Sequence, residues 1–156
     1  MPRTVTEARP RAAAAKTRRR RLNRRSASVL AVVSAGGAIG ALARWGIASL
    51  LPARTGGFPW ATFITNAAGC LLIGALMVLV TEVWNGRRLI RPFLGVGVLG
   101  GFTTFSTYVV DIQRLLAERE AATALGYLAG TMAVALAATW VGTVATQGFI
   151  HRRGSR

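Results

Sequence analysis

A run of hydroxyl side chains follows a glycine pair near the middle of the third apolar segment of this chain. The five hydroxyl residues are Thr103, Thr104, Ser106, Thr107 and Tyr108. Directly before them, Gly100 and Gly101 lower the helix propensity by about 1 kcal/mol each relative to alanine. Backbone that leaves the helical pattern at membrane depth is tolerated only where protein buries it or where it lines a polar cavity. The stretch therefore predicts either a broken membrane helix that forms an ion or substrate site, or a kink packed through small residues.

Polar side chains also interrupt the other apolar segments. Arg44 is the one full charge well inside them. It predicts a functional role, although its distance from the helix end would also allow the side chain to reach the membrane interface. The Asn66 amide needs a partner on another helix or in a polar pathway. Tyr127 and Thr131 are the early polar residues of the fourth segment.

Catalytic and metal-binding patterns are missing from the sequence. Cys70 lies in an apolar segment, where a small buried residue is expected, and His151 lies in the basic C-terminal tail. The sequence has no Ser/His/Asp set, no carboxylate pair inside a span and no phosphate-binding glycine loop. We therefore do not expect an enzyme.

The apolar residues are gathered in four segments of this 156-residue chain, which is 52% hydrophobic. The segments are residues 27–51, 60–82, 92–116 and 121–147. Each is long enough to span a bilayer as a tilted helix. We expect an all-α integral membrane protein with four transmembrane helices, the third broken near its centre. A disordered basic N-terminal arm (1–26), a membrane domain (27–148) and a basic C-terminal tail (149–156) complete the predicted organisation.

Positive charge is distributed unequally between the two sides of the predicted membrane domain. The side with both tails and the link after the second span holds sixteen Lys and Arg residues, whereas the other side holds three. Because Lys and Arg are enriched in cytoplasmic segments, both termini are predicted to be cytoplasmic. The basic arm leads directly into the first span, so we expect it to contact anionic lipid head groups rather than nucleic acid.

Three stretches of the chain resemble the CrcB/Fluc family of fluoride channels. They read GGAIGALARW from Gly36, TFITNAAGCLLIG from Thr62 and GVLGGFTTFSTY from Gly97. The resemblance covers all four spans. It implies a channel in the plasma membrane that passes fluoride out of the cytoplasm and so gives fluoride resistance. It also implies an antiparallel dimer with two anion pores and a structural sodium ion at its centre.

The resemblance assigns roles to individual residues. Backbone carbonyl groups of Gly100 and Thr103 would hold the sodium ion, and an unwound segment does offer oxygen atoms that suit a hard cation. Phe105 would face the anion with the electropositive edge of its ring. The residues expected along the anion pathway are Arg44, Asn66, Phe105, Ser106, Thr107, Tyr108, Tyr127 and Thr131.

Two residues and the charge bias depart from what the family pattern implies. Tyr108 stands where the family has its second pore phenylalanine, and Asp111 stands where it has a glutamate. We hypothesise that a pore with Tyr108 conducts differently, or that this protomer supplies a weaker second pore. The charge bias opposes insertion in both orientations. It therefore favours pairing with a related, oppositely inserted subunit, with a homodimer as the alternative.

Two other functions fit four short apolar spans. A small proton-coupled multidrug exporter needs a carboxylate deep in the first span, where this chain has Arg44. A non-transporting membrane subunit would use the basic arm to recruit a partner or nucleic acid. A passive fluoride pathway needs neither an ATP site nor a proton-coupling carboxylate, because a potential of 100 mV supplies about 2.3 kcal/mol per charge. The fluoride channel is therefore the expected function.

Overall fold

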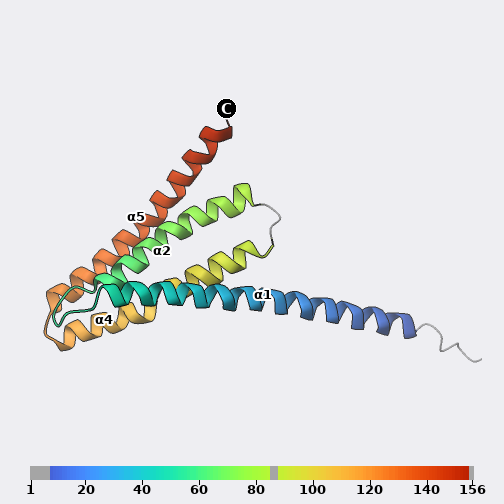
Figure 1. Cartoon of the computed structure of the whole chain (residues 1–156), viewed down its shortest axis with the longest axis horizontal. Helices are drawn as coiled ribbons and strands as arrows, with labels where there is room; N and C mark the ends of the chain where they lie inside the picture. The colour runs from blue at the N-terminus through green and yellow to red at the C-terminus, as the bar shows by residue number, and fades with distance from the viewer. Residues whose placement is uncertain (1–7, 85–87, 155–156) are drawn as a thin grey trace, which may run out of the picture.

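The computed structural model describes the backbone of residues 8–84 and 88–154, and the side chains of residues 26–84 and 88–152. Within these ranges all regular structure is helical (Figure 1). In chain order the elements are α1 (Ala8–Leu50), α2 (Trp60–Val78), the π-helices η1 (Leu79–Val83) and η2 (Arg91–Leu99), α3 (Gly100–Phe102), α4 (Phe105–Ala117) and α5 (Ala121–Gly154).

Four helical stretches are long and apolar enough to cross a membrane. They run over Ser26–Leu50, Trp60–Val83, Arg91–Ala117 and Ala121–Arg152. The third of them is assembled from η2, α3 and α4. The first three begin and end within one residue of the predicted spans, and the fourth continues five residues beyond its predicted end. The prediction of an all-α protein with four transmembrane helices is confirmed.

The first helix differs from the prediction at its N-terminal end. α1 begins at Ala8 and continues into the first span, whereas the sequence predicted a disordered arm over residues 1–26. Alanine and arginine, which dominate residues 11–21, are strong helix formers and account for the helical backbone. Residues 1–7 lie outside the described residues. Figure 1 shows the N-terminal part of α1 projecting beyond the other helices.

α1 packs along η2 and α3, and the close approach of these backbones depends on glycine. A Cβ atom at Gly40 would meet the carbonyl oxygen of Val98, and a Cβ atom at Gly101 would meet the carbonyl oxygen of Gly37. Small residues let helices approach closely in lipid, where van der Waals packing drives their association. Gly101 is therefore needed for the contact with α1.

α2 packs against α5 in the same manner. A Cβ atom at Gly74 would meet the carbonyl oxygen of Thr139, and a Cβ atom at Gly142 would meet the carbonyl oxygen of Leu71. The main partner of α1 is thus the third span, and the main partner of α2 is the fourth.

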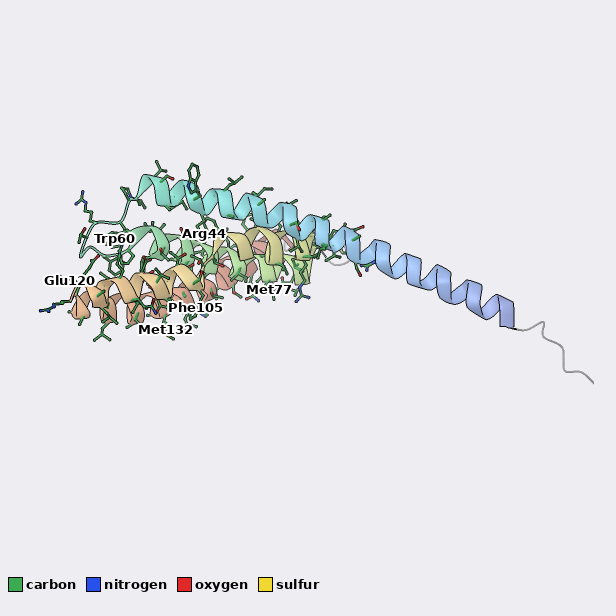
Figure 2. All side chains as sticks on the ribbon, turned by 90° about the horizontal axis from the view of Figure 1, so that it is seen from below. Arg44, Trp60, Met77, Phe105, Glu120 and Met132 are labelled. Atoms are coloured by element: carbon green, nitrogen blue, oxygen red, sulfur yellow. The ribbon has the colours of Figure 1, made fainter. Side chains whose placement is uncertain are left out.

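The α1–α2 loop and the α4–α5 turn meet at one end of the bundle. The backbone N–H of Gly56 donates a hydrogen bond to Glu118 Oε2 at 2.5 Å. Gly56 has a φ of 67°, which glycine adopts without steric cost. Figure 2 shows Trp60 and Glu120, which lie at the ends of these two connections, at the same end of the bundle. The two connections therefore lie on one side of the membrane.

Large apolar side chains cover the outside of the single chain. Leu136 is 74% exposed and Trp140 is 68% exposed. The enclosed core is small, and its buried members are Tyr108, Leu115, Ala124 and Tyr127. This distribution fits helices whose outer faces contact lipid or another chain.

Replacing Gly40 by alanine should destabilise the bundle, because the added methyl group has no space beside the Val98 backbone. Overpacking of this kind costs about 1–3 kcal/mol. We expect Gly40→Ala to lower the temperature of thermal unfolding in detergent micelles. Gly46→Ala is the matched control on the same helix, since its Cβ would have no neighbour within 4 Å. Equal unfolding temperatures for the two variants would contradict the close contact at Gly40.

Candidate functional site

The third span is interrupted between α3 and α4. Thr103 has φ and ψ angles of −78° and 157°, and Thr104 has angles of −149° and 125°, so both residues are extended. Gly100 remains helical at −65° and −33°. The interruption thus lies at the two threonines rather than at the glycine pair. Their β-branched side chains favour extended backbone, which accounts for this position.

Asn66 on α2 binds both polar backbone groups of Thr104. The Thr104 N–H donates to Asn66 Oδ1 at 2.9 Å, and Asn66 Nδ2 donates to the Thr104 carbonyl oxygen at 3.0 Å. We call this pair of hydrogen bonds the Asn66 clamp. In lipid an unsatisfied backbone group costs several kcal/mol. The clamp replaces hydrogen bonds that the helix loses at its interruption.

The interruption also deprives two backbone carbonyl groups of the N–H donors that they would have in a regular helix. In an unbroken helix the Gly100 carbonyl would accept from the Thr104 N–H, and the Thr103 carbonyl would accept from the Thr107 N–H. Instead, the Thr104 N–H donates to Asn66. The Thr107 N–H donates to Thr104 Oγ1 at 3.2 Å. The residues that lose these bonds, Gly100 and Thr103, are the two whose carbonyl groups were expected to hold sodium.

Arg44 reaches the same region from α1. Its Nε donates to the carbonyl oxygen of Gly101 at 3.2 Å, and the side chain is half-buried. The guanidinium group therefore makes a polar contact inside the membrane domain rather than serving only to reach the interface. Its positive charge lies beside the interrupted backbone.

The side chain of Thr104 caps the N-terminus of α4. Its Oγ1 accepts from the Thr107 N–H, and it lies 3.1 Å from Thr107 Oγ1 and 3.2 Å from Ser106 Oγ. Ser106 is exposed and Thr107 is half-buried. The predicted hydroxyl residues thus gather at the first turn of α4, where the helix dipole favours negative charge.

An open groove of about 380 Å³ runs along the interruption, and we call it the Phe105 groove. Six of the residues that the resemblance assigns to the sodium ion or to the anion pathway line it: Asn66, Gly100, Thr103, Phe105, Tyr108 and Thr131. The Phe105 side chain is 77% exposed. Figure 2 shows Phe105 and Met132, which also lines the groove, on one side of the bundle, away from Arg44. A mostly apolar wall with a few polar groups is typical of a ligand site.

A second groove of about 320 Å³ lies between α1, α2 and the start of α4, and we call it the Arg44 groove. Its polar groups come from Arg44, Thr62, Thr65, Thr104 and Thr107. Thr104 lines both grooves. Of the predicted pathway residues, the first groove is lined by Asn66, Phe105, Tyr108 and Thr131, and the second by Arg44 and Thr107. Ser106 and Tyr127 line neither groove.

Two buried hydroxyl groups on α5 have no hydrogen-bond partner within the described part of the chain. They belong to Tyr127, which is 0% exposed, and Thr131, which is 9% exposed. The Tyr127 ring packs on the Tyr108 ring with 5.2 Å between their centroids. A buried hydroxyl without a partner is costly. Thr131 lines the Phe105 groove, so its hydroxyl is suited to donate to a ligand there, whereas Tyr127 lines neither that groove nor the Arg44 groove.

Thr62 is a partner that the sequence analysis missed. Its Oγ1 donates to Asp111 Oδ2 at 2.7 Å, and both side chains are buried. Thr62 precedes Asn66 by four residues, so the two residues share one face of α2. That spacing is the signal that could have identified it. The carboxylate of Asp111 is thus held against α2.

Comparison with known proteins assigns the chain to a family. Residues 31–143 match the family model described as CrcB-like protein, Camphor Resistance (CrcB). The chain belongs to the CrcB family. All three stretches that carried the resemblance lie within the matched residues, so the resemblance to CrcB proteins is confirmed.

Several CrcB relatives have curated names. The protein named fluoride-specific ion channel FluC 2 in Streptomyces avermitilis is 55% identical over 118 residues, which cover 76% of this chain and 75% of the relative. The FluC 2 protein of Nocardia farcinica is 53% identical, over 77% of this chain and 86% of that protein. The FluC 1 protein of Streptomyces coelicolor is 50% identical, over 85% and 86% respectively.

Asn66→Ala removes both bonds of the Asn66 clamp and should loosen the interruption. Asn66→Asp is the matched comparison, because it keeps an acceptor for the Thr104 N–H but loses the donor to the Thr104 carbonyl. We expect amide hydrogen exchange at Thr104 to be faster in Asn66→Ala than in Asn66→Asp. An unsatisfied buried group costs about 1–3 kcal/mol, which corresponds to roughly fivefold to hundredfold faster exchange by local opening. Unchanged exchange in Asn66→Ala would show that the clamp does not hold the backbone.

Proposed function

We propose that this chain is a subunit of a fluoride-specific ion channel. The observation that carries the proposal is the Phe105 groove, an open path beside an interrupted membrane helix, lined by an aromatic ring and by polar groups. The relatives from Streptomyces avermitilis and Nocardia farcinica are named fluoride-specific ion channels. The chain is thus a membrane channel protein rather than an enzyme.

Hydrogen-bond donors in and beside the groove replace the water around a fluoride ion. Asn66 Nδ2 carries a second hydrogen besides the one that it donates to Thr104. The hydroxyl group of Thr131, which lines the groove, has no partner within the described residues. Such hydrogens attract an anion and repel a cation. Phe105 adds the electropositive edge of its ring, and the positive charge of Arg44 lies in the neighbouring groove.

Export requires no energy source beyond the membrane potential. Hydrogen fluoride is a weak acid that crosses bilayers in its neutral form and ionises in a near-neutral cytoplasm, where the anion is trapped. A negative-inside potential of 100 mV drives each fluoride ion outward by about 2.3 kcal/mol. Passive flow through the channel therefore lowers cytoplasmic fluoride and gives fluoride resistance.

The interruption offers a place for a structural sodium ion. The carbonyl groups of Gly100 and Thr103 lose their helical N–H partners, and carbonyl oxygens are ligands that suit a hard cation. Two carbonyl groups are too few to surround such an ion. A second chain would supply another pair, so the ion would join two chains at their interruptions.

A second subunit in the opposite orientation would close the open side of the Phe105 groove. Phe105 is 77% exposed, and Cβ atoms at Gly126 and Gly130 would have no neighbour within 4 Å. Glycines one turn apart on a helix allow close approach of another helix in lipid. These uncovered surfaces support an antiparallel dimer in which each subunit completes the groove of the other.

The partner is a related chain inserted in the opposite orientation rather than a second copy. Sixteen Lys and Arg residues on the side of both termini, against three on the other, favour one orientation with both termini in the cytoplasm. Streptomyces avermitilis has two relatives, named FluC 2 and FluC 3, that are 55% and 42% identical to this chain. One organism can therefore hold two related chains, and the pair would lie in the plasma membrane.

Fluoride efflux from liposomes tests the channel. Vesicles that contain the protein, alone or with an oppositely oriented relative, should release fluoride far faster than protein-free vesicles and should retain chloride. Phe105→Ala should slow fluoride release by about tenfold, equivalent to about 1.4 kcal/mol, because the anion loses its contact with the ring edge. Trp140→Ala is the control, since Trp140 is 68% exposed on the outer surface of α5.

The same vesicles test the proposed channel and the proposed structural sodium ion independently of each other. Failure of correctly folded protein to release fluoride, both alone and with a relative, would contradict the channel. Replacing sodium by potassium on both sides should slow fluoride release, because the larger cation fits carbonyl ligands placed for sodium less well. Equal rates in the two salts would contradict the structural sodium ion and leave the channel standing.

Cysteine labelling of intact cells tests the orientation. In a Cys70→Ala background, a membrane-impermeant maleimide should label Thr55→Cys in the α1–α2 loop and should not label Arg156→Cys in the C-terminal tail. The charge bias is the reason for this expectation. Labelling of both positions to similar extents would show insertion in both orientations and would support a homodimer.

A further inference from the structure

A third hollow lies beside the α1–α2 loop and has a volume of about 440 Å³. We call it the loop hollow. It is lined by Leu50 at the end of α1, by Leu51, Arg54 and Phe58 in the loop, and by Trp60 at the start of α2. None of its lining residues lines the Phe105 groove or the Arg44 groove. The loop hollow is therefore separate from the proposed anion pathway.

The loop hollow lies at a boundary of the membrane. The first span ends at Leu50 and the second begins at Trp60. Leu50 is 81% exposed and Trp60 is 56% exposed. Figure 2 shows Trp60 at one end of the bundle. Because tryptophan rings favour the level of the lipid head groups, the hollow opens where phosphate groups meet acyl chains.

The apolar wall of the loop hollow is fixed by aromatic packing. The ring centroid of Phe58 lies 4.6 Å from that of Trp60 and 5.3 Å from that of Tyr127 on α5. The backbone N–H of Trp60 donates to the Phe58 carbonyl oxygen at 2.9 Å, and that of Gly57 donates to the Arg54 carbonyl oxygen at 3.0 Å. A wall that is already ordered lowers the entropic cost of binding a ligand.

Arg54 is the charged residue among those that line the loop hollow. The two carboxylates at the same end of the bundle have other partners, since Glu118 accepts from the Gly56 N–H and Glu120 accepts from Thr123. Arg54 forms no ion pair with any residue that the structure describes. A guanidinium group presents paired N–H donors that match two oxygen atoms of a phosphate group. The hollow thus combines a phosphate-binding group with an apolar wall.

We propose that the loop hollow binds an anionic phospholipid from the leaflet that faces the α1–α2 loop. The lipid phosphate accepts from the Arg54 guanidinium, and an acyl chain runs along Leu50 and Trp60. A zwitterionic lipid binds less well, because its own cation opposes the attraction to Arg54. The bound lipid holds the loop, and the bond between Gly56 and Glu118 transmits this restraint to the α4–α5 turn. Binding therefore stabilises the folded bundle.

The test measures thermal unfolding of the purified protein in uncharged detergent micelles. Phosphatidylglycerol, phosphatidylcholine or soluble glycerol phosphate is added to the wild type and to two variants. Arg54→Gln removes the charge from the loop hollow. Arg119→Gln is the matched control, because Arg119 is an exposed arginine of the α4–α5 turn that does not line the hollow. Equal unfolding temperatures without additives show that the variants are folded.

We expect phosphatidylglycerol, at several times its dissociation constant, to raise the unfolding temperature of the wild type and of Arg119→Gln by about 2–4 °C. Arg54→Gln should lose most of this rise, and the other two additives should have little effect on any of the three proteins. No rise in the wild type, or an equal rise in Arg54→Gln, would overturn the lipid site.

The remaining outcomes distinguish the lipid from other sources of negative charge. An equal rise with glycerol phosphate would show that the hollow binds phosphate without acyl chains and would overturn the lipid as its ligand. An equal rise with phosphatidylcholine would overturn the preference for an anionic head group. Loss of the rise in Arg119→Gln as well as in Arg54→Gln would show a general attraction of the basic surface and would overturn the loop hollow as the site. The proposed channel is unaffected by each of these results.

Discussion

Every backbone polar group of a helix in lipid must find a partner, and the interruption of the third span is the place where this chain has to meet that requirement with side chains. Asn66 reaches from α2 to both polar groups of Thr104, and Arg44 reaches from α1 to the carbonyl of Gly101. Glycine contacts such as that of Gly40 with Val98 keep α1 close enough for this. The interruption is thus supported from two neighbouring helices, which fixes the positions of the polar groups that line the two grooves.

The same requirement separates structural hydroxyl groups from those that a ligand can use. Thr103, Thr104 and Tyr108 donate their hydroxyl hydrogens to protein oxygen atoms. Thr131, which lines the Phe105 groove, has a buried hydroxyl group that finds no partner in the part of the chain that the structure describes. Hydroxyl groups of the second kind are those that can offer a hydrogen to an anion. Residue type alone does not distinguish the two kinds, since all four side chains carry a hydroxyl group.

The four spans could be predicted because segment length and hydrophobicity decide which helices cross a membrane. The position of the interruption could not be predicted from the sequence, because a glycine in a membrane helix can either weaken the helix or let another helix approach it closely. At Gly101 the contact with α1 is the role that the structure shows. The sequence also indicated that Arg44 and Asn66 need polar partners, but those partners are 57 and 38 residues away along the chain. Such pairings, like that of Thr62 with Asp111, depend on packing between helices and are invisible to local patterns.

The pairing of helices that are not neighbours in sequence has a consequence for biosynthesis. α1 packs mainly on the third span and α2 mainly on the fourth, so neither partner has been synthesised when the first two helices leave the ribosome. Each must first persist in lipid as an individual helix and associate later. Until the third span arrives, Arg44 and Asn66 lack the carbonyl and amide groups that they bind in the finished bundle. The cell's insertion machinery therefore has to accommodate two unpaired polar side chains during translation, and the bundle is complete only after its last helix has entered the membrane.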